Sequence, residues 1–412
     1  MQQLLLTNIE RLVNVQQPQA PLRREALANL PVLENAFLLI ENGRIKDYGL
    51  MNEIPQAYHS CSTSDCSGNT ILPAWCDSHT HLVFAASREE EFVDKIKGLS
   101  YAEIAARGGG ILNSARKLNL MTEDELYEKA MHRLRQLMAL GTGAIEIKSG
   151  YGLNVESELK MLRVIQRIKQ HVPIPVRATF LGAHTYPPEY KNDHAGYIKL
   201  ITDEMLPAIA KEKLADYIDV FCEEGFFSAD EMRTICNAGM NYGLKPKLHI
   251  NQLSSIGGVQ ASVEMNALSI DHLETMNEAD VEALASSGTI GTLLPTAAYF
   301  LRMPFQPAKK LIDAGAAIAL ASDFNPGSSP SGNMNMVVSM SCIQMKMLPE
   351  EAINAATING AFAMELEHDC GSIAKGKLAN FIFYKNLPSL AYIPYAFGNN
   401  LIDRVMMMGR EA

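Results

Sequence analysis

The stretch TILPAWCDSHTH, residues 70–81, joins an apolar run to two histidines. The run at 71–75 is short and apolar, as expected of a buried strand. Side chains two positions apart on an extended backbone point to the same side, so His79 and His81 face one direction. Two neutral imidazoles that converge in this way can hold a divalent metal such as zinc or iron. The H-x-H spacing is weak evidence by itself, because such pairs also arise by chance.

The composition is that of an ordinary globular protein. Its 412 residues, 47% hydrophobic and 20% charged, suffice for one large barrel and a smaller domain. The net charge of −10 disfavours nucleic acid as a partner. The N-terminus lacks a basic, apolar leader, and no apolar run reaches the roughly 18 residues that a membrane span needs. Seven cysteines without a C-x-x-C pair are typical of a reducing compartment, so we expect a cytoplasmic protein.

Both ends of the chain are predicted to be rich in β-strands. Residues 36–48 predict a hairpin, with Glu-Asn-Gly at its turn. Residues 380–384 and 401–409 predict two strands near the C-terminus. We therefore expect residues 1–70 and 371–412 to form one small composite β domain, with two independent flaps as the alternative.

The middle of the chain, 71–370, alternates short apolar runs with segments of helical periodicity. The expected strands are 71–75, 144–147, 176–181, 218–221, 244–249, 267–270, 289–294 and 317–321. The expected helices are 123–140, 156–170, 196–211, 229–238, 259–265, 278–286, 308–314 and 334–347. Eight strands that are each followed by a helix predict a (β/α)8 barrel of the TIM type.

Metal-ligating residue types stand where the expected strands end. In chain order they are His79, His81, His184, His249, His272 and Asp323. The C-terminal ends of barrel strands line a single mouth, where catalytic residues collect. A histidine packed in the core would explain any one of these positions, but it explains five at one mouth poorly.

This arrangement resembles the amidohydrolase superfamily of metal-dependent barrel hydrolases. Longer stretches are similar, within it, to the imidazolonepropionase family, whose members open a ring in histidine degradation. These stretches are DSHTHLVF at 77–84, SRE at 87–89, GGGIL at 108–112, KSGYGL at 148–153, LGAH at 181–184, PPEY at 187–190 and SDFNPGSSP at 322–330. The resemblance covers essentially the whole chain.

The resemblance implies one divalent metal per chain, Zn2+ or an iron ion (Fe2+ or Fe3+), with water completing the site. The implied metal ligands are His79, His81, His249 and Asp323. Binuclear members of the superfamily carry a carbamylated lysine on a barrel strand, and Lys148 is the candidate for that role here. The alternative is that Lys148 forms an ion pair near the mouth, with Glu146, Glu223 or Glu224.

The implied reaction is hydrolytic opening of 4-imidazolone-5-propanoate to N-formimidoyl-L-glutamate. A bound metal lowers the pKa of its water towards neutrality, which supplies the nucleophile. We expect Asp323 to carry the proton of that water to the leaving ring nitrogen. His272 is expected to orient the water or to stabilise the oxyanion, and Gln252 to hydrogen-bond the ring edge without a charge.

Other residues are expected to hold a substrate that carries a carboxylate. Arg88 is expected to bind the propionate through its guanidinium fork. Its alternative is a surface ion pair with Glu89, Glu90 or Glu91. The loop after the eighth strand offers amides and a hydroxyl suited to a carboxylate, at Asn325, Gly327 and Ser328.

Two aromatic side chains complete the expected site. Tyr151, in a glycine-flanked turn, is expected to project its hydroxyl into the mouth, with a packed core aromatic as the alternative. His184 is expected to donate a hydrogen bond to the substrate ring or its carbonyl. We also expect a homodimer, because the helical faces of large barrels commonly pair.

Two other functions stay open. A deaminase of the cytosine or guanine kind shares the metal ligands, but it needs a glutamate as proton shuttle three residues after His249, where this chain has Gln252. The chain also departs from the family at Asn251, where an acidic residue is usual, which puts the charge beside the metal in doubt. A catalytically inactive barrel used as an assembly scaffold is the remaining alternative, although all four implied ligands are present.

Overall fold

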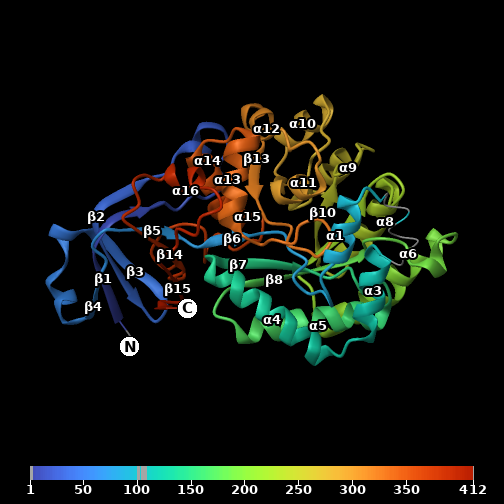
Figure 1. The fold of residues 1–412 in the computed structure, drawn as a ribbon, viewed down its shortest axis with the longest axis horizontal. Coiled ribbons are helices and arrows are strands. Elements are labelled where there is room, and N and C mark those ends of the chain that lie inside the picture. Colours follow the sequence, from blue (N-terminus) through green and yellow to red (C-terminus); the bar gives the residue numbers. More distant parts are fainter. Residues whose placement is uncertain (1–2, 100–102, 104–108, 412) are drawn as a thin grey trace.

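The computed structural model describes residues 3–99, 103 and 109–411. Two parts are visible in Figure 1, a smaller sheet that contains strands from both ends of the chain and a larger barrel surrounded by helices. The predicted fold class, a (β/α)8 barrel with a composite β domain, is confirmed. Gly108 of the GGGIL stretch lies outside the described residues.

Eight parallel strands form the barrel in their order along the chain. They are β6 (Trp75–Asp77), β7 (Thr142–Lys148), β8 (Val176–Ala183), β9 (Tyr217–Cys222), β10 (Lys245–Ile250), β11 (Ser269–His272), β12 (Ile290–Leu293) and β13 (Ala317–Leu320). The ring closes just beyond β6 and β13, where Thr80 and Phe324 form a parallel bridge. There the His81 amide donates to the Phe324 carbonyl at 2.9 Å, and the Asp323 amide donates to the His79 carbonyl at 3.0 Å.

Helices cover the outside of the barrel (Figure 1). Those between consecutive strands from β7 on are α5 (Val155–His171), η4 (Pro188–Tyr190), α6 (His194–Leu200), the π-helical η5 (Ile201–Met205), α7 (Leu206–Glu212), α8 (Ala229–Met240), α9 (Gly258–Glu264), α10 (Glu278–Ala285), α11 (Pro295–Leu301) and α12 (Ala308–Ala314). After β13 come α13 (Met334–Met345), α14 (Pro349–Asn354), the π-helical η6 (Ala355–Asn359), α15 (Gly360–Phe362) and α16 (Tyr392–Tyr395). Side-chain oxygens of Asn154, Ser228 and Asn277 cap the starts of α5, α8 and α10, which fixes where these helices begin.

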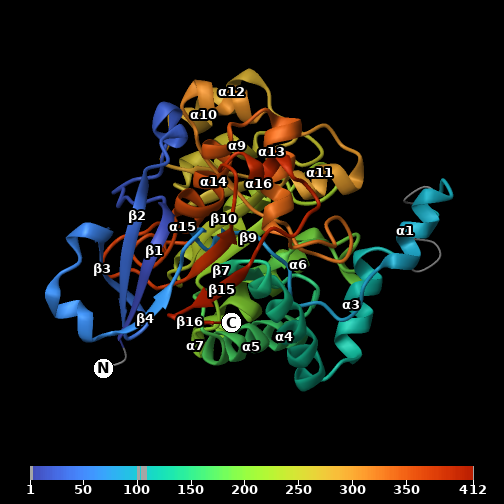
Figure 2. The ribbon, with the colours of Figure 1, turned by 60° about the vertical axis from the view of Figure 1, so that its left-hand side comes forward.

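The connection between β6 and β7 is the longest, and it holds α1 (Glu89–Ile96), α3 (Ile111–Leu120) and α4 (Glu123–Ala139). Of these, the sequence predicts only α4, which Thr122 starts with a capping box. Figure 2 shows α1 projecting from the body of the barrel. Within the described ranges, no helix is both long and apolar enough to cross a membrane.

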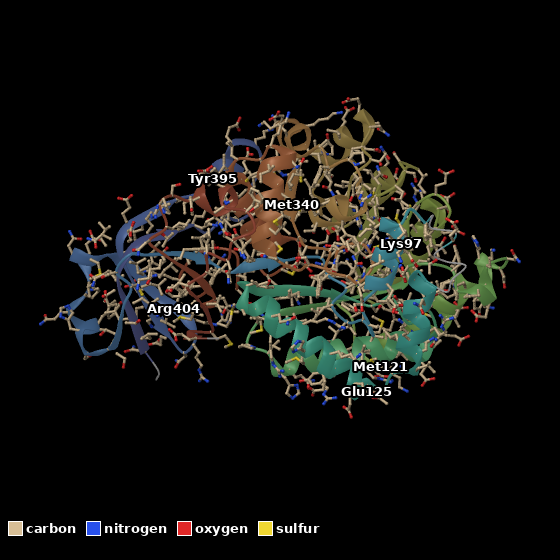
Figure 3. All side chains as sticks on the ribbon, viewed as in Figure 1. Lys97, Met121, Glu125, Met340, Tyr395 and Arg404 are labelled. Carbon is tan, nitrogen blue, oxygen red and sulfur yellow. The ribbon has the colours of Figure 1, made fainter. Side chains whose placement is uncertain are left out.

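The smaller sheet is mixed and runs in the order β16-β15-β14-β5-β1-β2-β3, with β4 beside β1. Its strands are β1 (Gln3–Val13), β2 (Val32–Glu41), β3 (Arg44–Leu50), β4 (Ser62–Asp65), β5 (Asn69–Pro73), β14 (Phe381–Lys385), β15 (Arg404–Met407) and β16 (Arg410–Glu411). Short 3-10 helices join them, namely η1 (Arg24–Ala28), η2 (Met51–Glu53) and η3 (Gln56–Ser60). Strand β14 pairs antiparallel with β5, and Arg404 of β15, labelled in Figure 3, lies 4.4 Å from the ring centre of Phe383.

The predicted first barrel strand, 71–75, covers parts of two strands. Ile71 belongs to β5 in the smaller sheet, where it pairs with Phe383. Trp75 begins β6 in the barrel, and its amide donates to the Gly141 carbonyl. Both strands are fully buried, so the apolar run continues from β5 into β6. The sequence pattern therefore does not show where the chain passes from the smaller sheet into the barrel.

Candidate active site

A cavity of about 450 Å³ lies at the C-terminal mouth of the barrel. Its lining includes all seven residues predicted to hold the substrate, which are Arg88, Tyr151, His184, Gln252, Asn325, Gly327 and Ser328. His81, His249, His272 and Asp323 line it as well. The structure therefore brings the predicted residues together, while their individual roles stay predictions.

The four implied metal ligands point their donor atoms at one another. Asp323 Oδ1 lies 3.4 Å from His79 Nε2 and 3.5 Å from His81 Nε2. His249 Nε2 lies 3.3 Å from His81 Nε2. Among the described residues, His79 Nε2 is buried without a hydrogen-bond partner, an arrangement that costs free energy unless a ligand is bound. Three imidazole nitrogens and a carboxylate oxygen are a donor set that fits a divalent metal.

Two residues of the cluster have unusual backbone conformations. His272 has a φ of 90° and Asp323 a φ of 51°, in the region that side chains other than glycine seldom adopt. Each such residue costs on the order of 1–3 kcal/mol, and strain of this kind collects at functional sites. Burial by itself would lower the pKa of His272, but the Glu274 carboxylate, 3.3 Å from Nδ1, raises it to about 9. Glu274 was not predicted from the sequence.

Lys148 is buried among carboxylates on the inner side of the barrel. Its Nζ lies 2.8 Å from Glu146 and 2.9 Å from Asp219. Burial alone would lower the pKa of Lys148, but Asp219 and Glu146 together raise it. An ammonium group does not react to form a carbamate, so this geometry favours the ion pair over the bridging role. Of its predicted partners Glu146 is found, whereas Glu223 instead accepts the Leu253 and Ser254 amides.

Arg88 lines the same cavity and forms the ion pair with Glu91 that was its predicted alternative, while its binding of a propionate stays a prediction. Glu91 Oε2 accepts from Arg88 Nε at 2.9 Å and from Nη2 at 2.6 Å, and the two side chains are only 13% and 11% exposed. The third guanidinium nitrogen, Nη1, packs closely against Gly327. A Cβ atom added at this glycine would lie only 2.3 Å from Nη1. The ion pair is therefore largely buried, and Nη1 packs against Gly327 in the lining of the cavity.

Lys95 is a cavity residue that the sequence did not predict. It lies on α1, and its Nζ is 3.5 Å from the Gly327 carbonyl. Burial and the neighbouring Arg88 lower the pKa of Lys95. In the sequence, Lys95 belongs to a charged helical segment of the kind that usually faces solvent. Only the fold shows that Lys95 and Arg88 both line the cavity.

The loop after β13 differs from the expectation in one respect. Asn325 Oδ1 accepts from the Gly327 and Ser328 amides, each at 2.8 Å, as asparagine side chains do in turns. Those two amides are therefore engaged within the loop and are not directed at a substrate carboxylate. The Ser328 hydroxyl lies 3.4 Å from Asp323 Oδ2, and the preceding residue, Gly327, is in contact with Arg88.

Tyr151 and His184 lie beside the metal cluster. The two rings are 5.5 Å apart, and the His184 ring stacks on His81 at 5.4 Å. His184 Nδ1 is 2.9 Å from the Gly150 carbonyl, so Nδ1 carries the proton. Burial lowers the pKa of His184 to about 3, which keeps the ring neutral and leaves Nε2 as a hydrogen-bond acceptor. Tyr151 is buried and lines the cavity, so it is both packed and available to a ligand.

Asn251 places no charge beside the metal cluster. Its Nδ2 donates to the Thr275 carbonyl at 2.8 Å and to Asp280 at 3.0 Å, so it holds the start of α10. Its φ of 56° suits asparagine, which tolerates the left-handed region better than most residues. The neighbouring Gln252 lines the cavity, as predicted for a residue that meets the substrate.

Comparison with known proteins places this fold and site in a class. Residues 70–412 match the model of the Amidohydrolase family. Among solved structures, a triazine hydrolase variant has a TM-score of 0.75 at 14% identity, over 99% of this chain and 94% of that one. The Escherichia coli guanine deaminase has a TM-score of 0.74 at 14% identity, over 100% and 99%. These structural likenesses show the fold alone, whereas the family match shows that the chain belongs to the amidohydrolase family.

Sequence relatives place the chain more narrowly. The imidazolonepropionase of Flavobacterium johnsoniae is 56% identical over 407 residues, which are 98% of this chain and 99% of that one. The imidazolonepropionase of Christiangramia forsetii is 53% identical over 408 residues, 99% of each chain. Within the amidohydrolases, the chain groups with the imidazolonepropionases.

Proposed function

We propose that the protein hydrolyses 4-imidazolone-5-propanoate to N-formimidoyl-L-glutamate. The observation that carries the proposal is the lining of one cavity, which combines a histidine and aspartate cluster with two cations, Arg88 and Lys95. A substrate with a hydrolysable lactam ring and a carboxylate on a short chain matches both groups. The names of relatives at 53–56% identity, over nearly the whole chain, agree with this substrate.

The chemistry needs a metal, and the donor set fits one divalent ion per chain, Zn2+ or iron. Its ligands would be His79, His81, His249 and Asp323. When bound, such an ion lowers the pKa of a coordinated water and polarises a carbonyl oxygen. The ammonium state of Lys148 supports one metal over a bridged pair.

Two residues are placed to move or to stabilise charge during ring opening. Asp323 accepts the proton of the attacking water and passes it to the ring nitrogen that leaves, as general base and then general acid. His272 faces the same point from β11 and, held by Glu274, is a proton donor at neutral pH. An imidazolium there stabilises the negative charge that develops on the lactam oxygen.

Neutral groups position the ring between these charges. His184 presents an unprotonated Nε2, so we propose that it accepts a ring N–H, in place of the donor role expected from the sequence. Gln252 offers both a donor and an acceptor without adding charge. A glutamate at this position is what a deaminase would use to shuttle protons, and an amide does not titrate.

The carboxylate end depends on side chains. Arg88 Nη1 and the Lys95 ammonium both lie against Gly327, and the hydroxyl of the next residue, Ser328, lines the same cavity. The Gly327 and Ser328 amides are engaged by Asn325, so we propose that these side chains bind the carboxylate. Glu91 offsets the charge of Arg88, so Lys95 keeps this end positive for an anion.

A direct assay tests the function. Purified protein should remove the ultraviolet absorbance of imidazolonepropionate and form N-formimidoyl-L-glutamate, with one metal per chain by elemental analysis. Guanine and cytosine serve as the matched alternatives in the same assay. Ammonia release from either of them, without turnover of imidazolonepropionate, would establish the deaminase instead, and no turnover of any substrate by metal-loaded protein would favour the scaffold.

We also propose that the protein works in the cytoplasm as a homodimer. All seven cysteines are free, which suits a reducing compartment. Helices α13 and α16 pack together. Tyr395 on α16, which is labelled in Figure 3, is 76% exposed. Ile343 on α13, Leu348 just before α14 and Phe397 just after α16 are also more than half exposed, so the elements packed around α13 present apolar side chains that a second copy would cover. Light scattering should give twice the chain mass of 45.3 kDa, and a single chain mass at micromolar concentration would contradict the dimer.

A further inference from the structure

We propose that Asp219 and Asp271 are positioning residues that fix the rings and the tautomers of His249 and His79 for metal binding. The inference rests on the proposed metal site and adds to it a supporting layer inside the barrel. Neither aspartate lines the cavity, and neither was predicted from the sequence. Both side chains are 0% exposed.

Asp219 holds His249 at two points. Its Oδ1 accepts the backbone N–H of His249 at 2.9 Å, and its Oδ2 lies 2.8 Å from His249 Nδ1. Because one carboxylate contacts both the backbone and the ring of the same residue, it fixes the rotation of that ring. Asp219 lies on β9 and His249 on the neighbouring β10, so the pairing of the two strands sets this geometry.

Asp271 holds His79 in a similar way across the barrel. Its Oδ2 lies 2.7 Å from His79 Nδ1. Its Oδ1 accepts from the Ser269 hydroxyl at 2.7 Å, which orients the carboxylate itself. Asp271 precedes His272 on β11, so one strand supplies a cavity residue and a support beneath the cavity.

A carboxylate at Nδ1 decides which nitrogen is free to bind metal. A neutral imidazole carries one proton, and a carboxylate next to Nδ1 draws it there. The lone pair is then on Nε2, which in both rings points at the donor cluster. The unpartnered Nε2 of His79 is the atom that this tautomer would present to a cation.

Two buried lysines contact the supporting carboxylates. Lys148 lies 2.9 Å from Asp219, and Lys247 lies 3.1 Å from Asp271, while Glu146 bridges the two lysines at 2.8 and 3.0 Å. These contacts fix the positions of the two aspartates behind the histidines.

Asparagine in place of either aspartate tests the role while keeping the volume. The side chain of Asp219→Asn can adopt two orientations. In one, its NH2 group donates to His249 Nδ1, which moves the ring proton to Nε2. In the other, its NH2 group faces the backbone N–H of His249, and that hydrogen bond is lost. We expect Asp219→Asn and Asp271→Asn each to weaken metal binding by about 10- to 100-fold in competition with a chelator. Glu146→Gln is the matched control, because Glu146 belongs to the same buried layer but contacts neither histidine. It should stay within about 3-fold of the unchanged protein.

A second measurement uses the unchanged protein and so does not depend on how the variants fold. In metal-free protein labelled with 15N-histidine, NMR should show His79 and His249 protonated on Nδ1 and bare on Nε2. Protonation on Nε2 in both rings would overturn the proposal, as would aspartate variants that bind metal no more weakly than Glu146→Gln. Neither metal affinity nor the histidine tautomer is measured through turnover. The positioning role can therefore be refuted while the proposed reaction stands, and the proposed reaction can be refuted while the positioning role stands.

Discussion

Replacing His249 with alanine is expected to abolish turnover and to leave a folded barrel. The change removes one of four metal donors, and metal chemistry supplies several kcal/mol of transition-state stabilisation, so kcat/KM should fall by at least about 1,000-fold. The fold should survive, because Asp219 keeps its ion pair with Lys148 and its bond from the backbone N–H of residue 249. Elemental analysis and steady-state kinetics on imidazolonepropionate measure the two effects.

A second histidine gives the control for this experiment. His132 is exposed on α4, where it contacts Gln136, and it lies outside the cavity. His132→Ala should keep both the metal and the activity. Full metal content with near-normal turnover in His249→Ala would contradict the ligand assignment. Two tightly held metals in the unchanged protein would restore the carbamylated Lys148.

The second large effect is expected from Arg88→Met, which keeps most of the side-chain volume and removes the guanidinium. If Nη1 binds the substrate carboxylate, the loss should cost about 2–4 kcal/mol, which is about 30- to 1,000-fold in kcat/KM. Part of the loss should appear as a raised KM, because the carboxylate is remote from the bond that breaks. Metal content should not change. Steady-state kinetics with imidazolonepropionate give the split between KM and kcat.

Neighbouring residues on α1 make this prediction specific. Lys97→Met removes an exposed cation from the end of the same helix, labelled in Figure 3, and should leave kcat/KM unchanged. Glu91→Gln weakens the support of Arg88 and should raise KM by a smaller factor than Arg88→Met. An unaltered kcat/KM in Arg88→Met would mean that Arg88 serves only its ion pair with Glu91 and does not bind substrate. The substrate assignment would then lose its main support.

The sequence predicted the barrel because its strands and site follow a repeating rule. Each strand is a short apolar run, and the residues that follow the runs, such as His79 and Asp323, carry metal-ligating groups. Strand order and mouth position follow from the parallel barrel alone. For this reason the sequence predicts most of the polar residues that line the cavity, with Lys95 as an exception.

The sequence did not predict the features that depend on which side chains meet. Lys247 and Asp271 lie within apolar strands, and nothing in the local pattern shows that they pair with each other or with a histidine. In the sequence, Lys95 is one of several charged residues of a helix. Its place in the cavity depends on the position of α1 at the mouth of the barrel. The Gly327 amide could serve a ligand or its own loop, and only the position of Asn325 decides between them.

The placement of β14 between β5 and β15 sets the order in which the molecule is completed during synthesis. Ribosomes release the chain from its N-terminus, so β5 emerges about 300 residues before the strand that covers its edge. Until residues 381–385 arrive, β5 has an uncovered edge, which favours pairing with other chains. Barrel closure waits in the same way, because His79 and His81 meet Asp323 only after the eighth strand is made. A nascent chain therefore contains every residue of the metal-binding cluster before its smaller sheet is complete. Loss of the last 32 residues, 381–412, would leave the edge of β5 unpaired beside a barrel whose eight strands are all present.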